Sequence, residues 1–159
     1  MENLKVIKAT KDDTLALISL IKGLATYEKR PEDMTATETE INYWMFERNI
    51  ATGLLLYKNN EPIGYAIYYP IFGSFSGKGK AYLEDMFIKK EFRGQGNGKF
   101  FFKEIIKHIF NENYSDMEWS CLDWNTPAMG FYHNIGAEKE TGRVHFEITK
   151  ENMEKLINK

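Results

Sequence analysis

Residues 82–102 read YLEDMFIKKEFRGQGNGKFFF, and this stretch decides the fold. Segment 82–88 has the aromatic and apolar content of a β-strand, interrupted by Glu84 and Asp85. Segment 93–98 holds too many glycines for the interior of a helix or strand. Segment 99–110 predicts a mostly buried helix. The order strand, glycine loop, helix directs backbone N–H groups and a positive helix end to one point, which favours binding of a phosphate.

The spacing of the glycines excludes two common phosphate-binding loops. A Walker loop would need a glycine where Arg93 stands and a Ser or Thr where Phe100 stands. A dinucleotide fingerprint starting at Gly94 meets Lys99 in place of its third glycine. The remaining pattern is R-x-x-G-x-G, which directly follows a strand with carboxylates. Taken alone, these six residues are a weak signal, and a flexible surface turn is the alternative.

Length and composition predict a globular chain with one domain, residues 1–159. The sequence is 43% hydrophobic and 14% aromatic, and no apolar run is long enough for a membrane span. The net charge of −2, with no basic face evident, argues against a nucleic-acid binder. We therefore expect neither a membrane nor a nucleic acid as a partner.

The number and spacing of the cysteines and histidines indicate the cellular location of the protein and whether it binds a metal ion. The N-terminus lacks a signal-peptide pattern, and one cysteine, Cys121, excludes an internal disulfide. This favours a cytoplasmic protein in which Cys121 is an inert core thiol. The three histidines are scattered without metal-ligand spacing, so no metal site is predicted.

The first third of the chain predicts a strand and two helices. Segment 4–9 alternates apolar and charged residues, as a half-buried strand does. Thr10 and Asp13 have capping-box spacing before a helix that ends near Pro31. The buried face of this helix is expected to carry Leu15, Ile18, Ile21 and either Leu24 or Ala25. Thr35 or Thr37 is then expected to cap a second helix.

The remainder predicts a mixed sheet. Strands are expected over 52–57, 62–69, 82–88, 116–124 and 144–148, with Asn59-Asn60 as a tight turn and 73–79 as a loop. Helices are expected after Asn125 and after Thr149. The hairpin favours antiparallel pairing, and the strand–helix–strand around the glycine loop favours parallel pairing. The fold class is therefore α/β (α+β), with helices on both faces of a mixed central sheet.

A second motif, WNTPAMGFYHNIGA at 124–137, makes the pattern more specific. Together with the glycine loop it resembles the two CoA-contacting motifs of the GNAT superfamily of N-acetyltransferases. Within that superfamily the chain is most similar to the diamine (spermidine/spermine) and thialysine N-acetyltransferases. Segments 24–28, 64–69 and 82–87 and the pair Trp124-Asn125 carry this closer resemblance. It implies the GNAT fold, acetyl-CoA as co-substrate, a small amine as acceptor, and a homodimer.

The resemblance also implies roles for individual residues. Contacts to acetyl-CoA are implied for Met86, Phe87, Ile88, Arg93, Gly94, Gln95, Gly96, Asn97, Gly98, Lys99, Asn125, Thr126, Pro127 and Ala128. Contacts to the amine are implied or suggested for Tyr27, Glu28, Tyr68, Tyr69, Glu84, Asp85, Glu118, Trp119 and Ser120. Glu84 is expected to act as the base, and Tyr132 as the acid.

These residue types suit the chemistry of N-acetyl transfer. A free alkylamine that resembles Lys is protonated below pH ~10.4, so it must lose a proton before it attacks. Glu84 can accept that proton directly or through water, and strand alternation predicts that Asp85 points to the opposite face. Tyr132 can donate a proton to the departing CoA thiolate, and a backbone N–H near Phe87 can bind the oxyanion. The alternatives are an ordinary ion pair for Glu84 and a core position for Tyr132.

Two other functions stay open at this point. The acceptor could be a different amine, such as an amino acid, an aminoglycoside or a protein N-terminus, or the chain could bind acyl-CoA without catalysis. Family members usually carry Trp where this chain has Arg143. If that position faces the site, the added cation would disfavour a polycationic substrate.

Overall fold

The structure is a computed structural model, and it describes residues 3–158. The chain forms two units, one that reaches to Ser120 and one that begins at Cys121, and each is described by itself. No helix among residues 3–158 is both long enough and apolar enough to cross a lipid bilayer.

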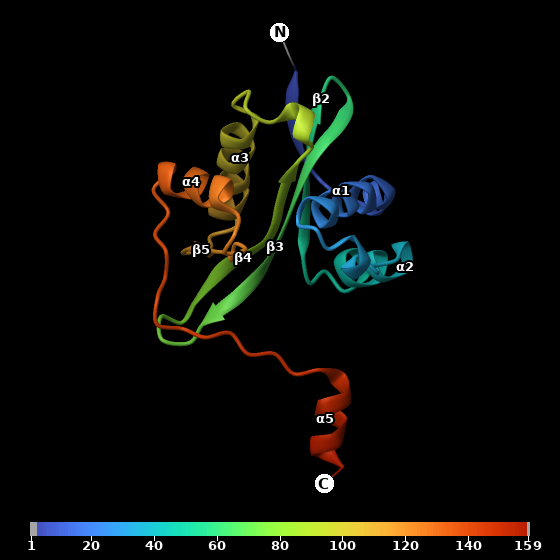
Figure 1. Cartoon of the computed structure of the whole chain (residues 1–159), viewed down its shortest axis with the longest axis vertical. Helices are drawn as coiled ribbons and strands as arrows, with labels where there is room; N and C mark the ends of the chain where they lie inside the picture. The colour runs from blue at the N-terminus through green and yellow to red at the C-terminus, as the bar shows by residue number, and fades with distance from the viewer. Residues whose placement is uncertain (1–2, 159) are drawn as a thin grey trace. The chain divides into compact units, whose positions relative to one another are not determined.

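The first unit contains one five-stranded sheet with strand order β1-β2-β3-β4-β5. Pairing is antiparallel from β1 to β4 and parallel between β4 and β5, which confirms the predicted mixed sheet. Helices α1 and α2 lie on one face of the sheet and α3 on the other (Figure 1). The elements of this unit are β1 (Leu4–Lys8), α1 (Thr14–Tyr27), α2 (Glu38–Ile41), the π-helical segment η3 (Asn42–Glu47), β2 (Thr52–Lys58), β3 (Glu61–Gly73), β4 (Lys78–Ile88), α3 (Asn97–Asn111) and β5 (Met117–Glu118).

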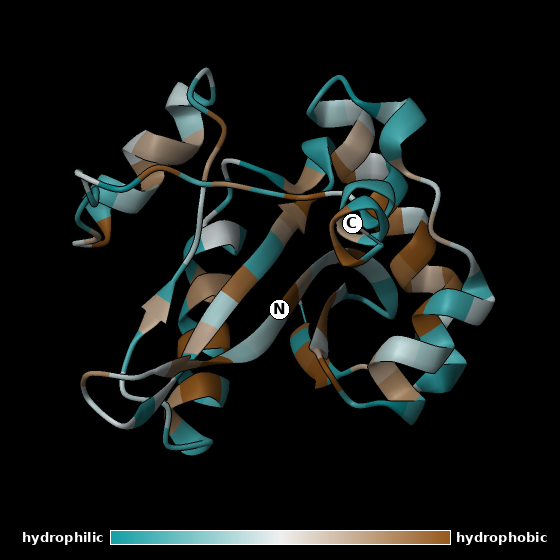
Figure 2. Ribbon diagram, turned by 90° about the horizontal axis from the view of Figure 1, so that it is seen from below, coloured by the Kyte–Doolittle hydropathy of each residue, from teal (hydrophilic) through white to brown (hydrophobic). Residues whose placement is uncertain are grey.

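Strand alternation divides the core between the two faces of the sheet. Leu55 and Tyr65 face α1 and α2, where they form a buried cluster with Leu17 and Leu20. Leu54 and Leu56 alternate with Leu55 and therefore face the α3 side. The buried residues of α3 are Asn97, Phe101, Phe102, Ile105 and Ile109. Figure 2 shows the resulting alternation of hydrophobic and hydrophilic residues along the strands and helices.

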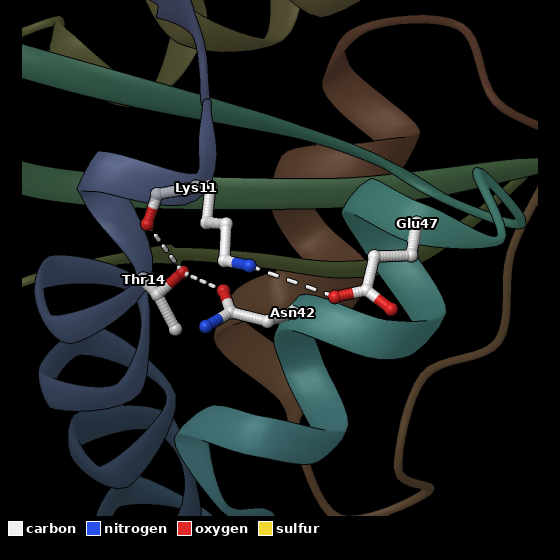
Figure 3. Close-up of polar contacts among 4 residues, drawn as sticks. All are labelled: Lys11, Thr14, Asn42 and Glu47. Atoms are coloured by element: carbon white, nitrogen blue, oxygen red, sulfur yellow. Dashed lines mark hydrogen bonds and ion pairs between the residues drawn. The ribbon is translucent and has the colours of Figure 1, made fainter.

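The start of α1 differs from the sequence prediction. Leu15 is 67% exposed, so its expected place on the buried face is wrong, whereas Thr14 is buried. The Thr14 hydroxyl lies 2.8 Å from the Lys11 carbonyl oxygen and within hydrogen-bond distance of the Asn42 amide, as Figure 3 shows. This inward position of Thr14 turns the neighbouring Leu15 outward, because adjacent helical residues point about 100° apart.

The predicted caps are present. Thr10 N–H donates to Asp13 Oδ2 at 2.8 Å, and Thr37 and Glu40 form a reciprocal capping box at the start of α2. Asn59 and Asn60 both have positive φ and join β2 to β3, as a tight hairpin turn requires. The third and fourth strands are longer than expected and form a second hairpin, which shortens the predicted 73–79 loop to 74–77.

The second unit contains α4 (Thr126–Asn134) and α5 (Lys150–Ile157). Asn125 caps α4 by accepting from Ala128 N–H at 3.3 Å, and Thr149 caps α5 in the same way through Asn152 N–H. Both caps were predicted from the sequence. Gly136, with φ 88°, follows the end of α4 as the predicted terminator.

Two predicted strands are not formed as expected. Strand 116–124 shrinks to β5, two residues long. Segment 144–148 is not a strand, and Val144 and Phe146 are mostly exposed. Apolar and polar residues do alternate in this segment, but no strand among residues 3–158 pairs with it. A strand needs a partner for its backbone groups, and alternation alone does not supply one.

Candidate active site

A β-bulge in β4 brings two carboxylates to one face of the sheet. Ile67 of β3 pairs with Asp85, but the next residue, Tyr68, pairs with Leu83, so Glu84 is an extra residue on β4. At such a bulge the strict alternation of side chains is interrupted. Glu84 and Asp85 contact Tyr69 and Tyr65 respectively, which share one face of the regular strand β3.

The predicted opposite orientation of Asp85 is therefore wrong. Alternation holds only for a regular strand, and the bulge adds a residue between the two side chains. Both carboxylates lie on the face that is covered by α1.

Asp85 is the more buried of the two carboxylates. Its Oδ2 accepts a hydrogen bond from the Tyr65 hydroxyl at 2.9 Å. Burial raises the pKa of Asp85 to about 6, aided by the charges of Glu84 and Glu28 and opposed by the Tyr65 hydrogen bond. Burial and the Asp85 carboxylate also raise the pKa of Tyr65, so Tyr65 stays a donor at neutral pH.

Glu84 is exposed and accepts one hydrogen bond, from the Tyr69 hydroxyl at 2.9 Å. The Tyr69 ring stacks on Tyr82 with centroids 5.3 Å apart, and the Tyr82 hydroxyl donates to Ser120 Oγ at 3.1 Å. Burial and the bond to Glu84 raise the pKa of Tyr69, which keeps it protonated. Glu84 is thus oriented from one side and open to solvent, as a base for an incoming amine must be.

The end of α1 contributes Tyr27 and Glu28 to the same face. Burial raises the pKa of Glu28, and the charge of Arg30 opposes this shift. Glu28 is close enough for its charge to act on both Asp85 and Tyr65. Three of the predicted amine-contacting residues, Glu28, Glu84 and Asp85, therefore form one acidic cluster.

The glycine loop has the geometry that an anion requires. Gly94 and Gly96 have φ of 75° and 82°, and nothing lies within 4 Å of a Cβ built on either, so backbone conformation explains both glycines. Helix α3 begins at Asn97, two residues earlier than predicted, and has no acidic residue in its first turn. Asn97 is buried and donates from Nδ2 to the Phe92 carbonyl at 2.9 Å, which anchors the turn.

Arg93 turns its side chain away from the glycine turn. Its Nε donates to the Ile88 carbonyl at 2.7 Å, and its guanidinium lies 4.5 Å from the Tyr27 ring centroid and 5.2 Å from that of Phe87. Arg93 therefore joins the loop to the end of α1. Lys99 is exposed in the first turn of α3.

The edge of β4 next to the loop is open within the first unit. The fifth strand pairs with β4 only at Ala81 and Tyr82, so no strand of residues 3–120 covers that edge from Leu83 to Ile88. Met86, Phe87 and Ile88, the predicted backbone contacts of the pantetheine arm, lie on this stretch. An open edge offers the N–H and C=O groups that an extended ligand can pair with.

Other predicted amine contacts differ in their surroundings. Glu118 is in β5, and Trp119 packs edge-on against Phe102 of α3 with centroids 5.6 Å apart. Tyr68 is buried on the α3 side, away from the acidic cluster. Tyr65 was missed by sequence reasoning, although its period-two spacing from Tyr69 placed it on the same strand face.

The second unit holds the other predicted site residues on and before α4. Asn125 is buried as the cap, Thr126 and Pro127 form the first turn, and Tyr132 is half-buried beside Phe131, with centroids 5.6 Å apart. Arg143 Nε forms an exposed ion pair with Glu140 Oε1 at 2.9 Å. That carboxylate offsets the charge of Arg143, which weakens the argument that Arg143 repels a polycation.

Metal binding has no obvious place in these residues. No group of three His, Cys, Asp or Glu side chains in the range 3–158 is arranged to hold a metal ion.

Solved structures share this fold. An integron cassette protein from the mobile metagenome of V. cholerae superimposes with a TM-score of 0.80 at 22% identity and 98% coverage of both chains. An aminoglycoside acetyltransferase solved with sisomicin superimposes with a TM-score of 0.79 at 18% identity, covering 92% of this chain and 95% of the other. The fold is thus one found among acetyltransferases.

The family follows from the sequence. The profile of the Acetyltransferase (GNAT) family matches residues 17–137, and the chain belongs to this family. Thialysine N-epsilon-acetyltransferase of Sus scrofa is 29% identical over 100% of both chains, and that of Caenorhabditis elegans is 26% identical over 85% of this chain and 83% of its own. The predicted resemblance, fold and N-acetyltransferase class are confirmed, and the family uses acetyl-CoA.

Proposed function

We propose that this enzyme transfers the acetyl group of acetyl-CoA to a primary amine of a small diamine, polyamine or thialysine-like acceptor. The observation that carries the proposal is the acidic cluster that Glu28, at the end of α1, forms with Glu84 and Asp85 of β4. Glu84 and Asp85 lie shortly before the glycine loop in the chain. A cluster of carboxylates attracts a cationic acceptor and favours one with two positive charges.

The cofactor end of the site fits the phosphates of CoA. The left-handed Gly96 opens α3, whose first backbone N–H groups and positive dipole end suit a pyrophosphate. The loop residues 93–99 would hold this group, and the open edge at Met86, Phe87 and Ile88 would pair with the pantetheine arm. Asn125, Thr126, Pro127 and Ala128 would complete the CoA contacts.

The reaction then needs two protons removed from the nitrogen and one supplied to the sulfur. Glu84 takes a proton from the ammonium group, directly or through water, and the neutral nitrogen attacks the thioester carbonyl carbon. A backbone N–H near Phe87 stabilises the oxyanion. The C–S bond breaks, Tyr132 donates a proton to the leaving thiolate, and the acylated nitrogen loses its second proton, which restores the phenol of Tyr132 through solvent. Amide and CoA are the products.

Acceptor screening at fixed acetyl-CoA tests the substrate class, with release of the CoA thiol as the readout. The panel pairs a diamine with a monoamine of equal chain length, and adds thialysine, an amino acid, an aminoglycoside and a peptide N-terminus. We expect turnover of the diamine or thialysine with a KM well below that of the monoamine. Equal KM values for the matched pair would contradict a role of the acidic cluster in selection.

The panel also separates the competing functions. Preference for the aminoglycoside, amino acid or peptide would replace the proposed acceptor while keeping the reaction. CoA binding in calorimetry without turnover of any amine would support a non-catalytic binding module. Retention of both Glu84 and Tyr132 argues against that module.

Two further expectations belong to this proposal. A homodimer is inferred from the family resemblance, and a cytoplasmic location from the single cysteine. Light scattering coupled to size-exclusion chromatography tests the dimer by its mass.

A further inference from the structure

A mostly buried lysine contacts the glycine loop from a distant part of the chain. Lys58, the last residue of β2, is 9% exposed. Its Nζ donates to Gln95 Oε1 at 3.1 Å and lies 5.5 Å from the centroid of the Phe92 ring. The β2–β3 turn and the loop before α3 lie at the same end of the sheet (Figure 1). The R-x-x-G-x-G pattern does not include this lysine, which precedes it by more than thirty residues.

Gln95 transmits this contact to the loop backbone. It stands between Gly94 and Gly96, the two residues with positive φ, and its Nε2 donates to the Glu91 carbonyl at 3.2 Å. The amide of Gln95 is therefore bonded at both ends, to Lys58 and to the backbone that precedes the loop. This arrangement ties Lys58 to the turn that leads into α3.

Lys58 places an ammonium group beside the loop that leads into α3. A cation and the positive N-terminal end of a helix both favour a nearby anion. Gln95 is the residue directly before Gly96, which caps α3. Lys58 and the helix end therefore add positive potential at the same place, and a bound pyrophosphate would offset both.

We propose that Lys58 is a positioning residue of the acetyl-CoA site, acting through Gln95 on the pyrophosphate loop. This inference rests on the proposed function. It assigns to β2 a role in cofactor affinity that is separate from the acidic cluster on β4.

Calorimetry with CoA and with ADP tests the inference, since ADP carries the pyrophosphate without the pantetheine arm. Lys58→Met keeps the apolar stem and removes the charge, and we expect its Kd for both ligands to rise about tenfold. Lys58→Arg keeps the charge and should restore most of the affinity. Lys22→Met, which removes an exposed lysine of α1, is the control for net charge and should change neither Kd.

A kinetic readout separates positioning from general damage to the fold. At saturating acetyl-CoA, kcat of Lys58→Met should stay within about twofold of wild type, while KM for acetyl-CoA rises about tenfold. If Lys58→Met does not fold, Gln95→Leu removes the acceptor from an exposed loop position and should weaken CoA and ADP in the same direction.

The outcomes distinguish the two proposals. An unchanged CoA Kd in a folded Lys58→Met variant would overturn the role of Lys58 alone. Wild-type protein that binds CoA but acetylates no amine would overturn the proposed function, and the two Kd values would still decide the role of Lys58. Wild-type protein that binds neither CoA nor ADP would overturn both.

Discussion

The hydroxyl of Tyr65 donates to the carboxylate of Asp85 at 2.9 Å, across the pair of strands that carries the acidic cluster. Tyr65 is fully buried, and four residues further along β3 Tyr69 makes the equivalent bond to Glu84. The bulge in β4 creates this repeat, because it places two consecutive carboxylates on one face. The two pairs differ in exposure, so they are expected to respond differently to substitution.

Asp85→Asn should stabilise the protein above pH 6 and not below pH 4. The pKa of Asp85 is raised from 3.8 to about 6 in the folded state, chiefly by burial. Between these values the folded state holds a proton that the unfolded state has lost, so wild-type stability decreases as pH rises through this window. The asparagine removes the buried charge and should add on the order of 2 kcal/mol at pH 8.

Urea unfolding of both proteins at pH 4 and pH 8 measures this difference. The exposed Asp12→Asn is the matched control, with an expected effect near zero at both pH values. A wild-type stability that rises between pH 4 and pH 6 relative to Asp85→Asn would contradict the burial of this carboxylate.

Glu84→Gln should lower kcat with little change in stability. The glutamine carbonyl can still accept from the Tyr69 hydroxyl, but it cannot take a proton from the amine. We expect kcat to drop on the order of 100-fold, in the range for loss of a general base. Thiol release under saturating substrates measures kcat, and a value within about twofold of wild type would rule out Glu84 as the base.

Tyr69→Phe should reduce activity more than Tyr68→Phe does. Tyr69 orients Glu84, and loss of its hydroxyl is expected to lower kcat/KM about tenfold, measured by release of the CoA thiol.

Tyr68 is the neighbouring control on the opposite face. Its buried hydroxyl has no hydrogen-bond partner among residues 3–158, so removal should leave activity unchanged and not decrease stability. Equal effects of the two substitutions on kcat/KM would show that Tyr69 does not orient the base.

Gly96→Ala should weaken CoA binding, whereas Gly130→Ala should stabilise the fold. Neither glycine has an atom within 4 Å of an added Cβ, but only Gly96 has positive φ, at 82°. Alanine at position 96 is strained by about 1–3 kcal/mol, and the shift of the α3 cap should raise the CoA Kd about tenfold.

Gly130 lies inside α4, where alanine is favoured by up to about 1 kcal/mol. Calorimetry with CoA and urea unfolding of both variants check these opposite effects. An unchanged Kd of Gly96→Ala for CoA would show that the glycine turn does not contribute to cofactor binding.

Local features of the sequence predicted much of the fold. The glycine loop, the Asn125 and Thr149 caps, and the turn at Asn59 and Asn60 depend on sterics and hydrogen bonds over a few residues, so their spacing is informative. The strand predicted over 52–57 is likewise present as β2.

Only the tertiary structure decided how the carboxylates and the distant residues meet. Strand alternation alone separates Glu84 from Asp85, and the bulge that unites them arises from the register with β3. Likewise, segment 144–148 has a strand pattern without a strand partner, and Lys58 reaches Gln95 only through the fold. The sequence alone thus determined the family and the glycine loop, because both depend on short-range patterns. The acidic cluster and its hydrogen bonds depend on pairing between segments that are far apart in the chain. The register of two strands and their edge contacts leave no pattern in the local sequence.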